Sequence, residues 1–152
     1  MLAIDYQEFE GPIDEAILLR LGTVTGPIFI APGQPEPAAE EVAEQLSVAV
    51  NGHRWIHLCT ASADGHLVGF KVGRSNDPRT FESWAGGVLP NARKQGIASH
   101  LARLQEAWCR SNGFQFIRTE TAHDNAAMLT VNLKEGFCIT GTYLDRGANL
   151  KV

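Results

Sequence analysis

The sequence predicts an α/β (α+β) fold: a single domain over residues 1–152, with a mixed, mostly antiparallel central sheet of six to seven strands flanked by about four helices. Three observations predict it. The 152 residues suit one domain with a sizeable core. Apolar residues switch repeatedly between a period of two and a helical period. A long helical pattern at 97–111 lies between two strand patterns, and a crossover of that length joins parallel strands.

The N-terminal third predicts one strand and two helices. Residues 3–9 alternate weakly and indicate an opening strand. Pro12 suits the start of a short helix that ends near Gly22. Residues 26–37 are rich in Pro and Gly and indicate a loop, whereas residues 38–50 carry one apolar stripe and predict an amphipathic helix.

The middle of the chain predicts three consecutive strands. Residues 55–61 and 67–72 flank an Asp64-Gly65 pair, which is a strong hairpin signal. Residues 81–89 predict the next strand, and the Gly86-Gly87 pair inside it suggests a bulge or a close approach of the backbone to a ligand. The remaining elements are expected in this order: a helix at 97–111, a strand at 116–121, a helix from Asp124 or Asn125 to about Glu135, a strand at 137–144 and a short strand at 149–152.

Composition excludes several classes of protein. The net charge of −4 disfavours general binding of nucleic acid, which usually requires a basic surface. No apolar run is long enough to span a membrane and no signal peptide opens the chain, so the expected location is the cytoplasm. The histidines and the three widely spaced cysteines show no ligand spacing, so no metal site is expected. The cysteines are Cys59, Cys109 and Cys138.

Residues 88–98, VLPNARKQGIA, are the most informative stretch of the chain. An apolar strand end leads through a proline turn and two cations to a helix that begins at Ile97 without a Ser, Thr, Asp or Asn cap. The first N–H groups of that helix have no internal partner, and Arg93 and Lys94 stand beside them. Gly96 lets a ligand approach the backbone closely. The stretch therefore predicts a site for a phosphate anion.

Two motifs give the chain a family resemblance. The pattern V-x-P-x-x-R-x-x-G-x-A at 88–98 resembles the acetyl-CoA pyrophosphate loop of the GNAT-type N-acetyltransferases. The pattern N-x-x-M-x-x-x-N-x-x-x-G-F at 125–137 resembles the later helix-and-strand motif of the same family, and the order of elements from Trp55 to the end matches its fold. The resemblance implies the following CoA-binding set: Val88, Leu89, Arg93, Lys94, Gln95, Gly96, Ile97, Ala98, Asn125 and Asn132.

The reaction needs a base that removes a proton from the attacking ammonium group. Glu82 is the candidate, because a period of two places it on one face of the strand with Trp84, Gly86 and Val88, unless the glycines introduce a bulge. The alternative is a solvated strand carboxylate without a catalytic role. A backbone N–H of Val88 or Leu89 is the expected donor to the oxyanion that the attack creates.

The departing CoA thiolate lacks its usual proton donor. Many relatives protonate it with a tyrosine four residues before the glycine of the second motif, and that position here is Asn132. Asparagine donates a hydrogen bond but supplies no proton at neutral pH. Tyr143 is a candidate acid if the last strands bring it near the sulfur, and otherwise it is a partly buried strand residue.

The resemblance implies a function. It is the transfer of an acetyl group from acetyl-CoA, the cosubstrate, to a primary amine of a small-molecule or peptide acceptor, by direct attack in a ternary complex. No metal, nucleic acid or membrane is expected to take part, and the family leaves a homodimer open. The alternative is a non-catalytic acyl-CoA-binding or sensing module, which the asparagine at position 132 favours.

Overall fold

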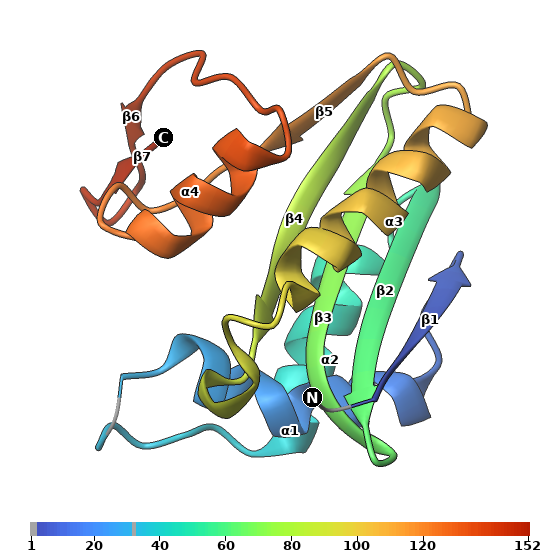
Figure 1. Ribbon diagram of the computed structural model, residues 1–152, viewed down its shortest axis with the longest axis vertical. Coiled ribbons are helices and arrows are strands. Elements are labelled where there is room, and N and C mark those ends of the chain that lie inside the picture. The colour runs from blue at the N-terminus through green and yellow to red at the C-terminus, as the bar shows by residue number, and fades with distance from the viewer. Residues whose placement is uncertain (1–2, 32) are drawn as a thin grey trace.

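A five-stranded sheet with the order β1-β2-β3-β4-β5 forms the centre of the protein (Figure 1). The computed structural model describes residues 3–31 and 33–152. Neighbouring strands from β1 to β4 are antiparallel, and β5 runs parallel to β4, as the hairpin and the long crossover predict. The strands are β1 (Ile4–Glu10), β2 (Trp55–Ala63), β3 (His66–Ser75), β4 (Thr80–Val88) and β5 (Phe116–Thr119).

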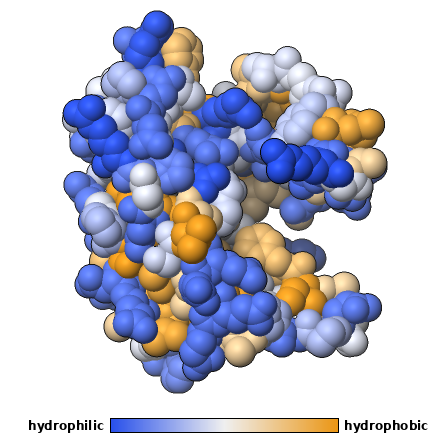
Figure 2. All heavy atoms as spheres, turned by 180° about the vertical axis from the view of Figure 1, so that it is seen from behind, coloured by the Kyte–Doolittle hydropathy of each residue, from blue (hydrophilic) through white to orange (hydrophobic). Residues whose placement is uncertain are grey.

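Helices cover both faces of this sheet. Two of them, α1 (Glu15–Phe29) and α2 (Ala39–Val50), pack on one face, and α3 (Ile97–Ser111) crosses the other. Beyond β5 lie α4 (Ala126–Lys134) and the short strands β6 (Tyr143–Leu144) and β7 (Leu150–Lys151). Seen from behind, the surface is hollowed between these C-terminal segments and the end of α1 (Figure 2). Within the described residues, no helix is long and apolar enough to cross a membrane.

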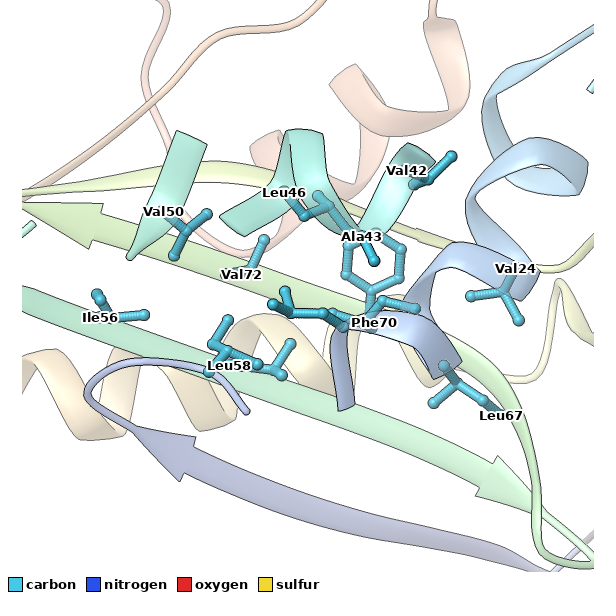
Figure 3. Packing of buried hydrophobic residues seen from close by; sticks show 13 residues of the cluster. Val24, Val42, Ala43, Leu46, Val50, Ile56, Leu58, Leu67, Phe70 and Val72 are labelled. Carbon is cyan, nitrogen blue, oxygen red and sulfur yellow. The ribbon is translucent and has the colours of Figure 1, made fainter. Parts of the chain in front are cut away.

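The alternation of side chains along the middle strands explains the two layers of helices. Leu58, Phe70 and Val72 point toward α1 and α2, where they pack with Leu46 and its neighbours (Figure 3). The residues between them face α3, as Cys59 does on β2. A sheet buried on both faces needs apolar residues at nearly every position, which is why β2 and β3 are so rich in them.

The first helix is longer than the sequence predicts. We expected it to end near Gly22, but α1 continues to Phe29 and takes in the start of the predicted loop, including Pro27. A Cβ built on Gly22 would lie 2.4 Å from the carbonyl oxygen of Ala39 at the start of α2. This glycine therefore permits a close helix contact, and it does not end the helix.

The strand count of the central sheet is lower than predicted. The expected strand at 137–144 is reduced to β6, which pairs only with β7 in a separate two-stranded sheet. Residues 137–140 instead line a cavity beside β5. The apolar side chains of this stretch turn toward that cavity without forming the backbone ladder of a sixth central strand.

A bulge in β4 lies two residues before the predicted place. Val72 pairs with Ala85 and Gly73 with Ser83, so Trp84 is the extra residue. The bulge reverses the facing of everything that precedes it. Glu82 pairs with Arg74 on the face of α1 and α2, and the prediction that it shares a face with Gly86 is wrong.

The candidate active site

A cleft opens where β4 and β5 separate. The two strands pair between Thr80–Ser83 and Phe116–Thr119, and beyond this point no strand of the described residues pairs with the free edge of β4. The resulting cleft has a volume of about 250 Å³ and reaches the hollow in Figure 2. Its walls are the second half of β4, the first turns of α3, the segment after β5 and one side of α4. A parallel pair that separates in this way exposes backbone donors and acceptors inside a cleft.

The free edge of β4 supplies one candidate donor for an oxyanion. The Leu89 N–H donates to the Val68 carbonyl at 2.8 Å, so it is already occupied. Because backbone groups alternate in direction along an antiparallel strand, the Val88 N–H points away from β3 toward the cleft. The Val88 carbonyl points the same way and accepts from Arg93 Nε at 3.0 Å. Of the two amides considered from the sequence, only that of Val88 remains available.

The loop after β4 has the open helix start that the sequence predicts. A single 3₁₀ turn, Pro90–Ala92, leads to Lys94 at φ 62° and Gly96 at φ 77°. No side chain caps α3, and among the described residues no backbone acceptor pairs with the N–H groups of residues 94–99. Consecutive amides with no internal partner at a helix start form a site for an anion.

The predicted CoA-binding residues of this loop take different places. Arg93, Lys94, Gln95 and Gly96 are exposed around the open amides. Ile97 is 2% exposed and packs in the core between α3 and the face of the sheet that α3 covers. The next residue, Ala98, lines the cleft. The loop therefore combines a buried anchor with an accessible backbone.

The two asparagines of the second motif have different environments. Asn125 Oδ1 accepts from the Met128 N–H at 3.1 Å, which caps α4, and the residue lines the cleft. Asn132 is 9% exposed, and its Nδ2 donates to Thr121 Oγ1 at 3.3 Å. Asn132 lines the cavity beside β5 and is not part of the cleft lining.

The candidate base lies outside the cleft lining. Glu82 Oε2 accepts from Arg74 Nε at 3.1 Å, and the Arg74 guanidinium lies 4.6 Å from the ring centroid of Trp84. The Glu82 side chain is 38% exposed on the face that carries α1 and α2. Trp84 itself lines the cleft. Glu82 is two residues away along the chain, and the bulge at Trp84 puts it on the opposite face of the sheet from Gly86.

A second carboxylate, Glu120, does line the cleft, and the sequence analysis missed it. It accepts hydrogen bonds from the Tyr143 hydroxyl and from the Arg118 guanidinium. Both bonds lower the pKa of Glu120, and the bond from Tyr143 has the larger effect. The hydrogen bond between Tyr143 and Glu120 also raises the pKa of Tyr143. Tyr143 itself is outside the cleft lining. The position of Glu120 immediately after a strand was the only available signal.

Two further polar residues line the cleft on its α3 side. Lys71 lies on β3 directly opposite Gly86, and burial lowers the pKa of its ammonium group to about 8. Ser83 on β4 is 3% exposed, and its hydroxyl has no hydrogen-bond partner. Their positions could not be inferred from the sequence, because they follow from the pairing of β3 with β4.

Comparisons with known proteins agree with this geometry. Residues 23–137 match the model of the acetyltransferase (GNAT) family. The chain is 30% identical, over 105 residues, to the aminoglycoside N(6')-acetyltransferase type 1 of Klebsiella aerogenes, covering 64% of this chain and 68% of that protein.

Two solved structures share the fold. One is AAC(6')-Iy in complex with the bisubstrate analogue CoA-S-monomethyl-acetylneamine, with a TM-score of 0.71, 17% identity and coverage of 94% of this chain and 96% of that one. The other is the ribosomal-protein-alanine N-acetyltransferase from Brucella melitensis biovar Abortus 2308, with a TM-score of 0.73, 15% identity and coverage of 95% and 99%. The chain therefore belongs to the acetyltransferase (GNAT) family: it is an N-acetyltransferase with acetyl-CoA as its cosubstrate, as the two motifs predict.

Proposed function

We propose that the protein transfers the acetyl group of acetyl-CoA to a primary amine of a small cationic acceptor of the aminoglycoside kind, by direct attack in a ternary complex. The observation that carries this proposal is the cleft between β4 and β5, whose lining includes Ala98 beside the open amides of α3 and the carboxylate of Glu120. The 30% identity to an aminoglycoside N(6')-acetyltransferase supports the class of acceptor.

The chain offers separate groups for the parts of CoA. The unpaired amides of residues 94–98, with the cations Arg93 and Lys94, suit the diphosphate. The free edge of β4 suits an extended amide-containing arm, which would pair with it as an added strand. At the acetyl end, the Val88 N–H is the donor that would stabilise negative charge on the carbonyl oxygen.

The acceptor has its own side of the molecule. The bulge at Trp84 turns Glu82 toward the face of α1 and α2, opposite the face on which α3 begins. An amine that enters from this face approaches the cleft without crossing residues 89–96, the loop that would hold the diphosphate. Glu82, directly or through a water molecule, would take the proton from the ammonium group, and Arg74 orients its carboxylate. Glu120 on the cleft wall, which is already paired with Arg118, is a second carboxylate acceptor for the ammonium groups of a polycation.

Thiol release from acetyl-CoA tests the class of acceptor. We expect release with aminoglycosides that carry a 6'-amine, and much slower release with the same compounds lacking that amine or with short peptides that begin with alanine. A faster reaction with the peptides would replace the small-molecule acceptor with a protein N-terminus. Tight binding of CoA without release for any amine would favour the sensing module.

Replacement of the candidate base is a sharper test of mechanism. We expect Glu82→Gln to lower turnover about 10²-fold while the dissociation constant of CoA stays unchanged. The loss should be largest below neutral pH, where the acceptor amine is almost fully protonated and depends most on a base. Glu44→Gln on the exposed side of α2 is the matched control and should behave as the unaltered protein. If the pH–rate profile of Glu82→Gln is unchanged, Glu82 is not the base.

A further inference from the structure

The cleft contains a cation that the family resemblance does not account for. Asn132 cannot supply a proton to the departing thiolate, and it lines a different cavity. Of the ionisable residues in the cleft lining, Glu120 is paired with Arg118, and Lys151 lies 3.8 Å from Asp145. The remaining one is Lys71, and within the described residues it takes part in no ion pair.

The register of the sheet places Lys71 beside the cleft. It lies in a central strand, on the face covered by α3, with Cys59 of β2 on one side and Gly86 of β4 on the other. A Cβ built on Gly86 would lie 3.1 Å from Lys71 Cα and 3.3 Å from Lys71 Cβ. Gly86 therefore lets β4 lie close against Lys71, and no side chain at position 86 stands between Lys71 and the cleft. Lys71 keeps partial exposure in the middle of the sheet and lines the cleft.

Ser83 and Gln105 are buried polar residues on the α3 side of the sheet, the side on which Lys71 lies. The Ser83 hydroxyl, two residues along the same face of the register, lines the cleft and has no hydrogen-bond partner. Gln105 on α3 is 1% exposed, and neither end of its amide has a partner among the residues that the structure describes. Unsatisfied buried polar groups are costly, and they are commonly retained where a ligand or a reaction uses them. A ligand or a reaction in the cleft would account for the open hydroxyl of Ser83 beside it.

We propose that Lys71 is the general acid of this enzyme and that its ammonium group protonates the CoA thiolate as it leaves. The inference rests on the proposed acetyl transfer. The base takes one proton from the ammonium group of the acceptor, and the neutral nitrogen then forms a bond to the acetyl carbon while the carbonyl π electrons move to oxygen. The carbonyl re-forms as the thiolate leaves: the carbon–sulfur bond breaks, its electron pair goes to sulfur, and the sulfur takes a proton from Lys71 Nζ. The nitrogen gives its second proton to solvent. The neutral lysine regains a proton from solvent when CoA departs.

The acidity of Lys71 suits this task. Burial is the main cause that lowers the pKa of its ammonium group to about 8, and the thiols of Cys59 on β2 and Cys109 on α3 oppose the shift. Those thiols stay neutral, since burial raises the pKa of both. On β4, the facing residues Ser83 and Gly86 do not titrate. A free thiol has a pKa of about 8.5, so the proton would pass between groups of nearly equal acidity, where general acids are efficient.

A binding experiment tests the proximity of Lys71 to the sulfur without an acceptor. The ultraviolet absorbance of the thiolate of bound CoA is titrated against pH, with desulfo-CoA in the reference cell to cancel the signal of the protein's own thiols. A nearby ammonium group favours the thiolate, so we expect it to form at lower pH on the unaltered protein than on Lys71→Met. Lys134→Met, which removes an exposed lysine at the end of α4, should titrate as the unaltered protein.

A kinetic experiment tests proton donation. We expect Lys71→Met to lower turnover about 10²-fold, with the dissociation constant of CoA within about twofold of the unaltered value, a shift of about 0.4 kcal/mol or less. The decrease in turnover above about pH 8 should disappear, because the group that must stay protonated is gone. Lys71→Arg keeps the charge, but its proton is held too firmly for donation, so it should restore the thiolate titration without restoring turnover.

Thermal unfolding separates this role from a structural one. The pKa of Lys71 is lower in the folded protein than in the unfolded chain, so its buried charge opposes folding below pH 8. This opposition fades as the pH rises from about 8 toward the ordinary lysine pKa of 10.5. We expect Lys71→Met to melt at a higher temperature at pH 7, with the difference narrowing above pH 8. A lysine kept for stability would give the opposite result.

Each failure has a distinct signature. If the unaltered protein releases no thiol with any amine, the proposed function fails and the role of Lys71 fails with it. If the unaltered protein is active and Lys71→Met matches it in turnover and pH profile, only the role of Lys71 is overturned. Acetylation of Lys71 by acetyl-CoA in the absence of an acceptor, seen by mass spectrometry, would make this residue a nucleophile and would also overturn the proposal.

Discussion

Helices α2 and α3 both begin without a side-chain cap, but the charges around their first turns differ. Neither has a side-chain cap: Ala38 precedes α2, and Gly96 precedes α3. The first turn of α2 contains two glutamates, whose negative charge complements the positive end of the helix dipole. The first turn of α3 has no acidic residue, and Arg93 and Lys94 precede it, which adds positive charge where the dipole is already positive.

The difference shows that an absent cap does not by itself identify an anion site. α2 balances its dipole with its own carboxylates, and its N-cap residue has the ordinary extended conformation, with φ −61°. α3 leaves the dipole unbalanced and approaches through two residues with positive φ, Lys94 and Gly96. Such a start is unfavourable unless an anion occupies it. The unfavourable charge and backbone at α3 are therefore the informative features, and we propose that the diphosphate of CoA is the anion.

Among the substitutions at these helix starts, Gly96→Asp should have the largest effect, and the effect should be on CoA affinity. The substitution places a negative charge where we propose that the diphosphate binds, and it forces a φ of 77° on a residue with a side chain. We expect the dissociation constant of CoA, measured by isothermal titration calorimetry, to rise at least about 100-fold, a loss of about 2.7 kcal/mol.

The matched control separates charge from backbone strain. Gly113→Asp introduces the same side chain at a glycine with φ 80° after the other end of α3, and nothing lies within 4 Å of its added Cβ. It should reduce stability without changing CoA affinity. Equal loss of affinity in both variants would show that strain in α3 is responsible, and near-normal affinity of Gly96→Asp would remove the diphosphate from this loop.

The bounds of α3 were predicted at both ends, because its signals are local. An apolar stripe at helical spacing, a preceding glycine and a following Asn-Gly pair all lie within the helix or next to it. Gly22 misled the sequence analysis for the opposite reason. Its purpose is a contact with Ala39, far along the chain, and a single sequence does not show which segments will meet.

The residues of the candidate site also fall into those with local sequence signals and those whose place depends on contacts between distant segments. The open helix start after β4 and the Asn125 cap were predictable, since each depends on neighbouring residues. The side on which Glu82 faces was not, because a one-residue bulge at Trp84 reverses it. Lys71 enters the cleft through its register with Gly86, which is a relation between two strands. Features that depend on cross-strand register are outside the reach of periodicity.

Asn125→Ala tests a third helix start, that of α4, which the Asn125 side chain caps. The loss of the acceptor for the Met128 N–H is expected to reduce the free energy of unfolding by about 1 kcal/mol. For a domain of this size this lowers the melting temperature by about 2–4 °C. Asn125→Ser retains a cap oxygen but loses the amide N–H groups, so it should recover the stability.

The same pair of variants tests the contact of Asn125 with CoA. If the side-chain amide donates to the pantetheine arm, both variants should bind CoA several-fold more weakly, since a neutral hydrogen bond contributes about 1 kcal/mol. Normal CoA affinity in Asn125→Ser would restrict the residue to capping. Loss of affinity in Asn125→Ala alone would show that the order of α4 is what CoA binding requires.

Ala38→Ser gives the smallest expected effect and tests the premise of the comparison. Ala38 is exposed and has the extended backbone of an N-cap, so a serine there can accept a hydrogen bond from the first turn of α2. We expect a gain of about 0.5 kcal/mol in the free energy of unfolding and no change in CoA affinity. The same substitution at Gly96 should reduce both, because a residue at φ 77° does not have the geometry of a capping serine and obstructs the anion site. Equal stabilisation by the two serines would mean that α3 lacks only a cap, and its open amides would then lose their meaning as a binding site.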